Sequence, residues 1–150
     1  MIRLVMASLA ALGLQVSVAQ AQGSATISGS DAGVSKQQTA TPDALKIRFR
    51  TGVSTIDADQ FAVLDEAARL FRDGSPLVMI VAGSADTVGS ADLNLQLSIR
   101  RAQSVAFALA DRGIPIERLQ VLGRGNSELE VNTANDTPNA ENRSVSITWR

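Results

Sequence analysis

The side chains best suited to bind a ligand lie between Gly83 and Arg101. An apolar run feeds into this stretch, Asp86 follows the run, and Arg101 lies on the helix expected after it. Asn94, Ser98 and Arg101 are spaced i, i+4 and i+7, so a helix places them on one face. A carboxylate and a guanidinium brought together in this way could bind a ligand that carries both an ammonium and a carboxylate, because arginine offers a planar fork for carboxylate oxygens.

Two residue types that carry much of enzyme chemistry are absent. The 150 residues include no Cys and no His. Disulfides, thiolate nucleophiles and Cys-type zinc sites are thereby excluded, as are the commonest general base and transition-metal ligand. Carboxylate-only catalysis of the glycosidase type, with residues such as Asp86 and Glu128, is the remaining enzymatic alternative. No paired-carboxylate motif supports it, so we expect a protein that is not an enzyme and needs no metal or cofactor.

Charge and composition limit the classes of partner that the protein is expected to bind. The formal net charge is −1 and aromatic residues make up 3% of the chain. A nucleic-acid binder needs a basic surface or aromatic stacking platforms, so we expect no nucleic-acid partner. The length and the hydrophobic content of 45% suit one globular domain with a substantial core.

The N-terminal 43 residues differ in character from the rest. Residues 1–21 are predicted to be a secretory signal peptide, with Arg3 before an apolar stretch and a small-x-small cleavage site at Ala19–Ala21. An uncleaved membrane anchor is the alternative, which the glutamines in this segment disfavour. Residues 22–43 are rich in Gly, Ser, Thr and Gln without periodicity, and we predict a flexible arm. The mature chain is expected to be exported, with no transmembrane span.

Four stretches of the remaining chain carry strand patterns. Leu45, Ile47 and Phe49 alternate with charged residues, which is the period of a half-buried strand, and the chain closes with a similar alternation up to Trp149. The predicted strands span residues 45–49, 77–82, 118–122 and 144–149.

Two amphipathic helices are predicted between these strands. The first covers residues 57–74, with Asp57 as the N-cap, Gln60 completing a capping box and Gly74 in the position after the last turn. The second covers residues 91–112 and begins after the N-cap Ser90. Its buried stripe is expected to comprise Leu93, Leu97, Val105 and Leu109.

The elements therefore follow the order β-α-β-α-β-β. Right-handed connections of this length place both helices on one face of a four-stranded mixed sheet, so we predict an α+β fold. Ligands in such layouts bind beyond the carboxyl ends of the parallel strands, which is where Asp86 falls. The polar segment 123–141 is predicted to be a long loop, and such loops are commonly functional.

Several motifs occur in a defined order between Gly83 and Val145. They are GSADTVG from Gly83, then Asn94, Leu97-Ser98 with Arg101-Ala102, Gly123-Arg124-Gly125, and Asn142-Arg143 with Val145. In this order and spacing they resemble the OmpA-like C-terminal domain family, over about residues 45–149. That family includes the periplasmic domains of outer-membrane porin A, the peptidoglycan-associated lipoprotein and flagellar stator proteins.

The resemblance implies a function for residues 44–150. Domains of this kind bind peptidoglycan non-covalently through the diaminopimelate of its stem peptide. Carried over by motif, Asp86 and Arg101 would hold the amino and carboxylate groups of diaminopimelate, and Asn94 and Arg143 would complete the ligand-binding site. The expected role is a cell-envelope anchoring module in the periplasm of a Gram-negative cell, associated with the outer membrane or the cell wall.

The chain departs from the family's motifs at three positions. Ser84 and Ala85 replace the usual His and Thr before the aspartate, and Ser144 replaces the second arginine of the NRR motif. These changes keep open an alternative, a degenerate domain that acts as a periplasmic protein–protein interaction module.

Some of these residues also have purely structural interpretations. Asn94 near a helix start could serve only to satisfy backbone groups, and Arg143 could be an ordinary charge at the start of a strand. Gly83, Gly89 and Gly125 are expected to serve turns or close backbone approach.

Overall fold

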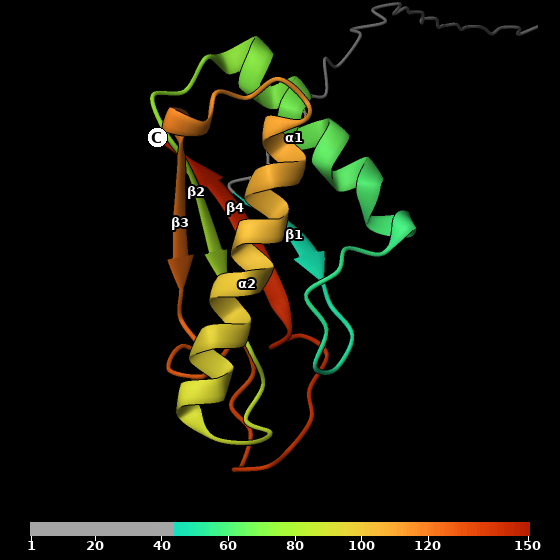
Figure 1. The fold of residues 1–150 in the computed structure, drawn as a ribbon, viewed down its shortest axis with the longest axis vertical. Coiled ribbons are helices and arrows are strands. Elements are labelled where there is room, and N and C mark those ends of the chain that lie inside the picture. Colours follow the sequence, from blue (N-terminus) through green and yellow to red (C-terminus); the bar gives the residue numbers. More distant parts are fainter. Residues whose placement is uncertain (1–43) are drawn as a thin grey trace, which may run out of the picture. The chain divides into compact units, whose positions relative to one another are not determined.

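The fold is that of a computed structural model, in which residues 44–150 are described. The predicted signal peptide and arm, residues 1–21 and 22–43, lie outside the described residues. Four strands and two α-helices make up the fold (Figure 1), and they are β1 Leu45–Arg48, α1 Phe61–Gly74, β2 Met79–Gly83, α2 Ala91–Ala110, β3 Leu119–Gly123 and β4 Ser144–Trp149. Short 3₁₀ turns at Ala58–Gln60 and Ile116–Arg118 precede α1 and β3.

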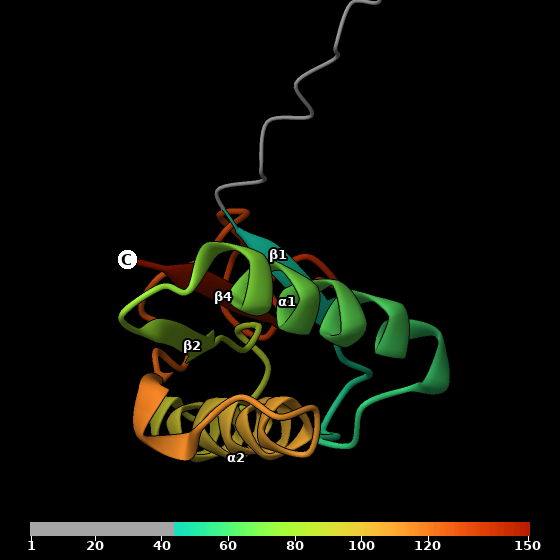
Figure 2. The ribbon, with the colours of Figure 1, turned by 90° about the horizontal axis from the view of Figure 1, so that it is seen from above.

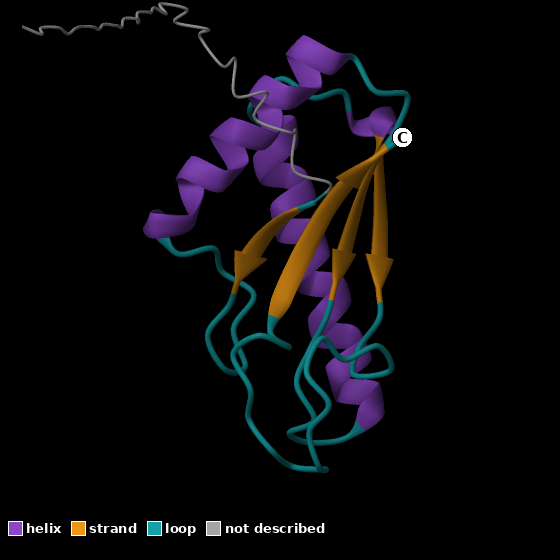
Figure 3. Ribbon diagram, turned by 180° about the vertical axis from the view of Figure 1, so that it is seen from behind, coloured by secondary structure: helices purple, strands orange, loops and turns teal. Residues whose placement is uncertain are grey.

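The strands form one mixed sheet in the order β1-β4-β2-β3. The last strand, β4, lies between β1 and β2 and runs antiparallel to both, whereas β2 and β3 are parallel. Both helices cover the same face, α1 against β1 and α2 against β2 and β3 (Figure 2). Seen from behind, the other face of the sheet carries no helix (Figure 3). The predicted α+β fold is therefore confirmed.

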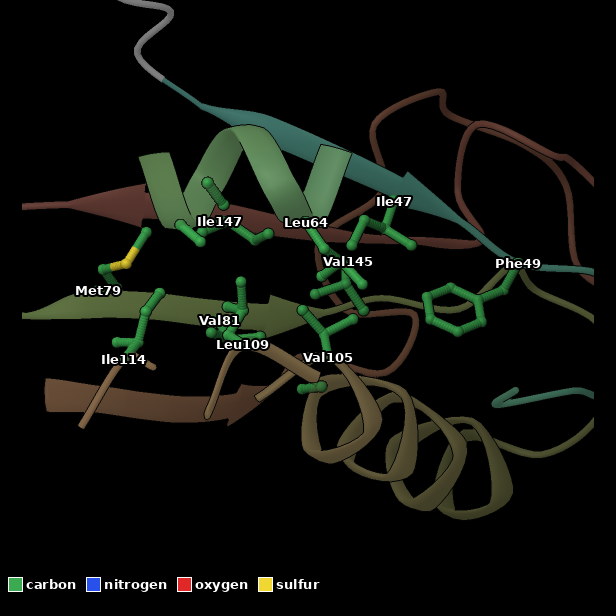
Figure 4. Close-up of a cluster of buried hydrophobic side chains, with 13 residues drawn as sticks. Ile47, Phe49, Leu64, Met79, Val81, Val105, Leu109, Ile114, Val145 and Ile147 are labelled. Atoms are coloured by element: carbon green, nitrogen blue, oxygen red, sulfur yellow. The ribbon is translucent and has the colours of Figure 1, made fainter. Parts of the chain in front are cut away.

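The hydrophobic core fills the space between the sheet and the helices. Alternate strand residues point into it, because neighbouring residues of a strand face opposite sides of the sheet. Burying a side chain of this size contributes about 1.5–3 kcal/mol, more than a typical surface ion pair. The larger core side chains (Figure 4) are Ile47, Phe49, Leu64, Met79, Val81, Val105, Leu109, Ile114, Val145 and Ile147.

The predicted capping box of α1 is wrong. The Asp57 side chain makes no capping hydrogen bond and instead accepts from the guanidinium of Arg50, at 2.7 and 3.1 Å. The Gln60 side chain accepts a hydrogen bond from the backbone N–H of Arg48. Both residues therefore tie the helix start to β1, because an ion-pair partner in the tertiary structure competes with the local cap.

The end of α1 also differs from the prediction. Gly74 is the last helical residue, and Ser75 takes the left-handed conformation with φ of 45°. The Ser75 N–H donates to the Phe71 carbonyl at 2.8 Å and closes the last turn. A residue with a Cβ atom thus occupies a position that normally favours glycine.

The predicted apolar stripe of α2 is half wrong. Val105 and Leu109 are buried, but Leu93 is 62% exposed and Leu97 is only half-buried. In the first half of α2, the buried face carries polar residues instead. They are Asn94, Ser98 and Arg101.

Glycines explain how this polar face comes to be buried. A Cβ atom on Gly83 would lie 2.0 Å from the backbone oxygen of Ser98, so the helix backbone rests directly on the end of β2. Gly125, with φ of 57°, is less tightly packed, since an added Cβ atom would lie 3.1 Å from the backbone of Leu95. Close backbone approach leaves no room for large apolar side chains, and small or hydrogen-bonding residues fill the interface.

Among residues 44–150, neither α1 nor α2 is both long enough and apolar enough to span a membrane.

Candidate functional site

The predicted binding residues gather at the carboxyl end of β2. Asp86 follows that strand, Asn94 and Arg101 come from the buried face of α2, and Arg143 directly precedes β4. The chain order separates Arg143 from Asp86 by 57 positions, and the insertion of β4 beside β2 brings them together.

Asp86 is a buried carboxylate with only 5% of its surface exposed. Its Oδ2 atom accepts a hydrogen bond from Nη1 of Arg143 at 2.9 Å, an ion pair within the site. The backbone N–H groups of Val88 and Asn139 lie 3.4 Å from its two oxygens. This carboxylate therefore faces a guanidinium and two backbone amide donors.

Arg101 is completely enclosed, with 0% of its surface exposed. Its guanidinium donates to the carbonyl oxygens of Val53 (2.9 Å), Ser84 (3.0 Å) and Arg50 (3.0 Å). It also lies over the ring of Phe49, 5.3 Å from the centroid. The guanidinium therefore holds the connection between β1 and α1 against the end of β2.

Burial also weakens the hold of Arg101 on its proton. Loss of hydration lowers the pKa of Arg101 to about 10, with the charge of Asp86 acting in the opposite direction and that of Arg143 adding to the lowering. The side chain still carries its positive charge at neutral pH. The site thus holds two guanidinium groups and one carboxylate.

Arg143 links the carboxylate to the same connection. Besides its ion pair with Asp86, its Nε atom donates to the Phe49 carbonyl at 3.2 Å. About 15% of its side chain is exposed, more than for Arg101 or Asp86. Arg143 is therefore the most accessible of the three charged groups.

Asn94 satisfies a backbone group near the start of α2, as its structural interpretation proposes. Its side-chain amide donates to the Val88 carbonyl at 3.1 Å, and it is 4% exposed. Ser98, one turn further along the same face, accepts a hydrogen bond from the Gly125 N–H at 2.9 Å. These two polar residues fasten α2 to the loops on either side of the charged cluster.

Two residues that support the site went unrecognised in the sequence. The Thr87 hydroxyl donates to the Ala134 carbonyl at 2.6 Å and accepts from the Thr137 N–H at 3.1 Å. The Asn142 amide bonds both the N–H and the carbonyl of Val131, each at 2.8 Å. Both residues hold the long loop between β3 and β4 in place. In the sequence, they are marked only by being next to Asp86 and Arg143.

The structure thus places Asp86, Arg101 and Arg143 in one charged cluster, whereas the Asn94 side chain is bonded to the Val88 carbonyl. Asp86 is paired with Arg143, whereas Arg101 is bonded to backbone carbonyls and cannot be touched by solvent. A ligand carboxylate can reach Arg143 at the surface of the cluster. It reaches Arg101 only if the segment 50–53 moves away.

The chain is similar in sequence to a known protein family. A model described as the OmpA family matches residues 48–143 of this chain.

Several curated proteins are similar in sequence. The probable lipoprotein YiaD of Escherichia coli (strain K12) is 29% identical over 102 residues, which cover 68% of this chain and 47% of that protein. Outer membrane protein A of Escherichia coli O157:H7 is 32% identical over 106 residues, 67% of this chain and 29% of that protein. The peptidoglycan-associated lipoprotein of Rhizobium meliloti (strain 1021) is 32% identical over 80 residues, 53% of this chain and 46% of that protein. The chain spans half or less of the length of these relatives.

Solved structures share the fold. The peptidoglycan-associated lipoprotein from Burkholderia pseudomallei has a TM-score of 0.65 at 19% identity, covering 70% of this chain and 89% of that one. The periplasmic domain of Helicobacter pylori MotB (residues 78–256) has a TM-score of 0.60 at 16% identity, covering 71% and 74%. The relatives named above are thus lipoproteins, an outer-membrane protein and a periplasmic domain, all of the cell envelope.

Proposed function

The chain belongs to the OmpA family, and on this basis we propose that it binds peptidoglycan non-covalently through the diaminopimelate of the stem peptide. The protein would act as an anchoring module in the periplasm, at the outer membrane or the cell wall. Two of the matched relatives are named as peptidoglycan-associated lipoproteins, which supports the choice of ligand. We also propose that binding involves no turnover of the polymer.

The observation that carries this proposal is the cluster formed by Asp86, Arg101 and Arg143. It holds one carboxylate and two guanidinium groups within one buried volume. A ligand carboxylate would balance the surplus positive charge, and a ligand ammonium would pair with Asp86. A zwitterionic amino-acid end, such as that of diaminopimelate, carries both groups at a fixed separation.

The two arginines would act in different ways. Arg143 is partly exposed and pairs with Asp86, so a ligand ammonium could replace it there while the freed guanidinium turns to the ligand carboxylate. Arg101 uses three of its five N–H donors on backbone carbonyls and keeps two. Those two donors become available to a ligand when the segment 50–53 shifts.

Co-sedimentation with purified peptidoglycan sacculi tests the proposal. Protein expressed from the full chain is compared with the Asp86→Ala and Arg101→Ala variants. Charge-assisted hydrogen bonds contribute about 1.5–3 kcal/mol, so each variant should bind about ten- to a hundred-fold more weakly. Arg100→Ala is the matched control, because Arg100 is exposed on the same helix and should bind as wild type does.

Circular dichroism establishes that each variant is folded. Wild-type protein that remains in the supernatant would refute peptidoglycan binding and turn attention to the alternative, an envelope protein–protein interaction module. Wild-type affinity in both folded variants would refute the role of the cluster. Release of soluble muropeptides from labelled sacculi would contradict the proposal that the protein is not an enzyme.

A further inference from the structure

A polar cavity lies on the helix-free face of the sheet, the face seen in Figure 3. Its volume is about 270 Å³, and strand β4 and the loop between β3 and β4 contribute most of its lining. None of Asp86, Asn94, Arg101 or Arg143 lines it. The cavity therefore contains none of the four predicted binding residues, although it adjoins their site through Ser84 and Asn142.

The charges around this cavity are balanced. Lys46 forms an ion pair with Glu130, and Arg124 pairs with Glu128 at 2.9 Å. The carboxylate of Glu141, also in the lining, is paired with a guanidinium from β1. A charged ligand would have to break one of these pairs or remain uncompensated, so the cavity suits a neutral molecule.

Serine residues contribute to the lining of the cavity. Ser144 is only 7% exposed, and its Oγ atom has no hydrogen-bond partner within residues 44–150. The Oγ of Ser84 also lacks one among the described residues, and the two serines lie side by side, since the Ser84 N–H donates to the Ser144 carbonyl at 2.8 Å. A buried polar group without a partner is costly, so an occupant that bonds it is favoured.

The same two serines mark departures from the motifs that the chain resembles. The family's usual residues at these positions are a histidine and an arginine, both much larger than serine. Two small side chains next to each other leave open space above β2 and β4, and Lys46 and Glu141 border it.

We propose that this cavity binds a small, neutral, polyhydroxylated molecule of about the size of a monosaccharide. Each hydroxyl of such a ligand both donates and accepts, so it can bond a serine Oγ while meeting the free donors of a lysine and the free acceptors of a glutamate. The volume is slightly below the roughly 300–1,000 Å³ of sites for drug-sized ligands, which fits one sugar ring. This inference does not depend on peptidoglycan binding at Asp86.

Nuclear magnetic resonance titration tests the proposal. ¹⁵N-labelled protein expressed from the full chain is titrated with glucose, with N-acetylglucosamine and with a soluble oligomer of N-acetylglucosamine. We expect saturable shifts of the Ser84 and Ser144 amides and unchanged amides at Asp86. Tighter binding of the oligomer than of either monosaccharide would identify a sugar unit within a polymer as the source; equal affinity would identify a free sugar.

Substitutions at Ser144 test whether the amide shifts arise from binding in the cavity. Ser144→Ala removes the unpaired hydroxyl and should weaken binding about three- to ten-fold. Ser144→Val also fills the space and should abolish binding. Thr148→Val is the matched control, because Thr148 lies on the same strand and face but outside the cavity, and it should bind as wild type does.

Three results would overturn the inference. The first is the absence of saturable shifts with every sugar at the highest soluble concentration, which would mean that water alone fills the cavity. The second is undiminished binding by Ser144→Val. The third is a response confined to Asp86 and Arg143. Loss of sugar binding in Ser144→Val with normal co-sedimentation on sacculi would separate this site from the proposed peptidoglycan site.

Discussion

Replacing Arg101 by lysine should detach the segment 50–53 from the end of β2. The guanidinium donates from three different nitrogens to three carbonyls, on Arg50, Val53 and Ser84. A lysine ammonium is a single compact group on a flexible stem and cannot reach acceptors that are spread around a planar fork. We expect Arg101→Lys to keep one of the three bonds.

The expected loss of stability follows from the number of hydrogen bonds that are lost. Each hydrogen bond to a charged group contributes about 1.5 kcal/mol or more, so the loss of two should lower the free energy of unfolding by about 3 kcal/mol. The charge itself is retained, so relief of desolvation does not offset the loss. Stability should also fall locally, because the carbonyls of Arg50 and Val53 would lose their hydrogen bonds to the Arg101 side chain.

Urea denaturation and amide hydrogen exchange measure the two effects. Arg101→Lys should shift the urea midpoint without a change in the m-value, and the amides of residues 51–54 should exchange faster than in wild type. Arg100→Lys serves as the control, because Arg100 is exposed and its unfolding free energy should change by less than about 0.5 kcal/mol. An equally small change in Arg101→Lys would refute the reasoning that this guanidinium holds the segment.

Further predictions concern packing, backbone conformation and pH. Gly83→Ala should cost about 3 kcal/mol in thermal or urea unfolding, because the added Cβ would lie 2.0 Å from the Ser98 oxygen; a fully stable variant would contradict the close packing. Ser75→Gly should raise the unfolding free energy by about 0.5–1 kcal/mol, because glycine adopts the φ of 45° without steric cost; a less stable variant would contradict this. The hydrogen bond from Arg69 lowers the pKa of Glu66, so this pair stabilises the fold at neutral pH, and the gain is lost as the pH falls through that lowered pKa. Acid titration of Glu66→Gln should show a smaller fall in stability than wild type shows, and identical acid curves would refute the contribution.

Strands and helices were predictable because their patterns are local. The alternation around Ile47, the apolar run of β2 and the N-cap Ser90 each act within a few residues, and the structure has an element at each place. Boundaries were less predictable. The apolar run begins at Leu77, yet β2 begins at Met79, because Leu77 lies beyond the sheet with 73% of its surface exposed.

The errors at the helices have a common cause. Asp57 has the type and position of an N-cap, but its carboxylate accepts hydrogen bonds from Arg50, two residues after the end of β1. Leu93 has the type and spacing of a core residue, but glycines on the facing strands draw the opposite side of α2 inward. In each case a contact that forms in the folded chain outcompeted the preference of the helix itself.

The candidate site was also predictable from local patterns only in part. Residue types and spacing were enough to select Asp86 and Arg101, to place Asn94, Ser98 and Arg101 on one helical face, and to assign the family. Pattern alone did not reveal that Asp86 pairs with Arg143, because that pairing depends on β4 entering the sheet beside β2.

Local chemistry therefore established the elements, their order and the groups available for binding. Tertiary packing determined which of those groups are paired, enclosed or left open. Arg101 could be recognised as a cation in a motif, but its enclosure by three carbonyls arises where two connections meet α2. Ser144 could be recognised as a departure from a motif, but the cavity above it exists only because a distant loop folds over the sheet. Backbone preferences act over a few residues, whereas burial and hydrogen-bond partners depend on segments that meet only in the folded chain.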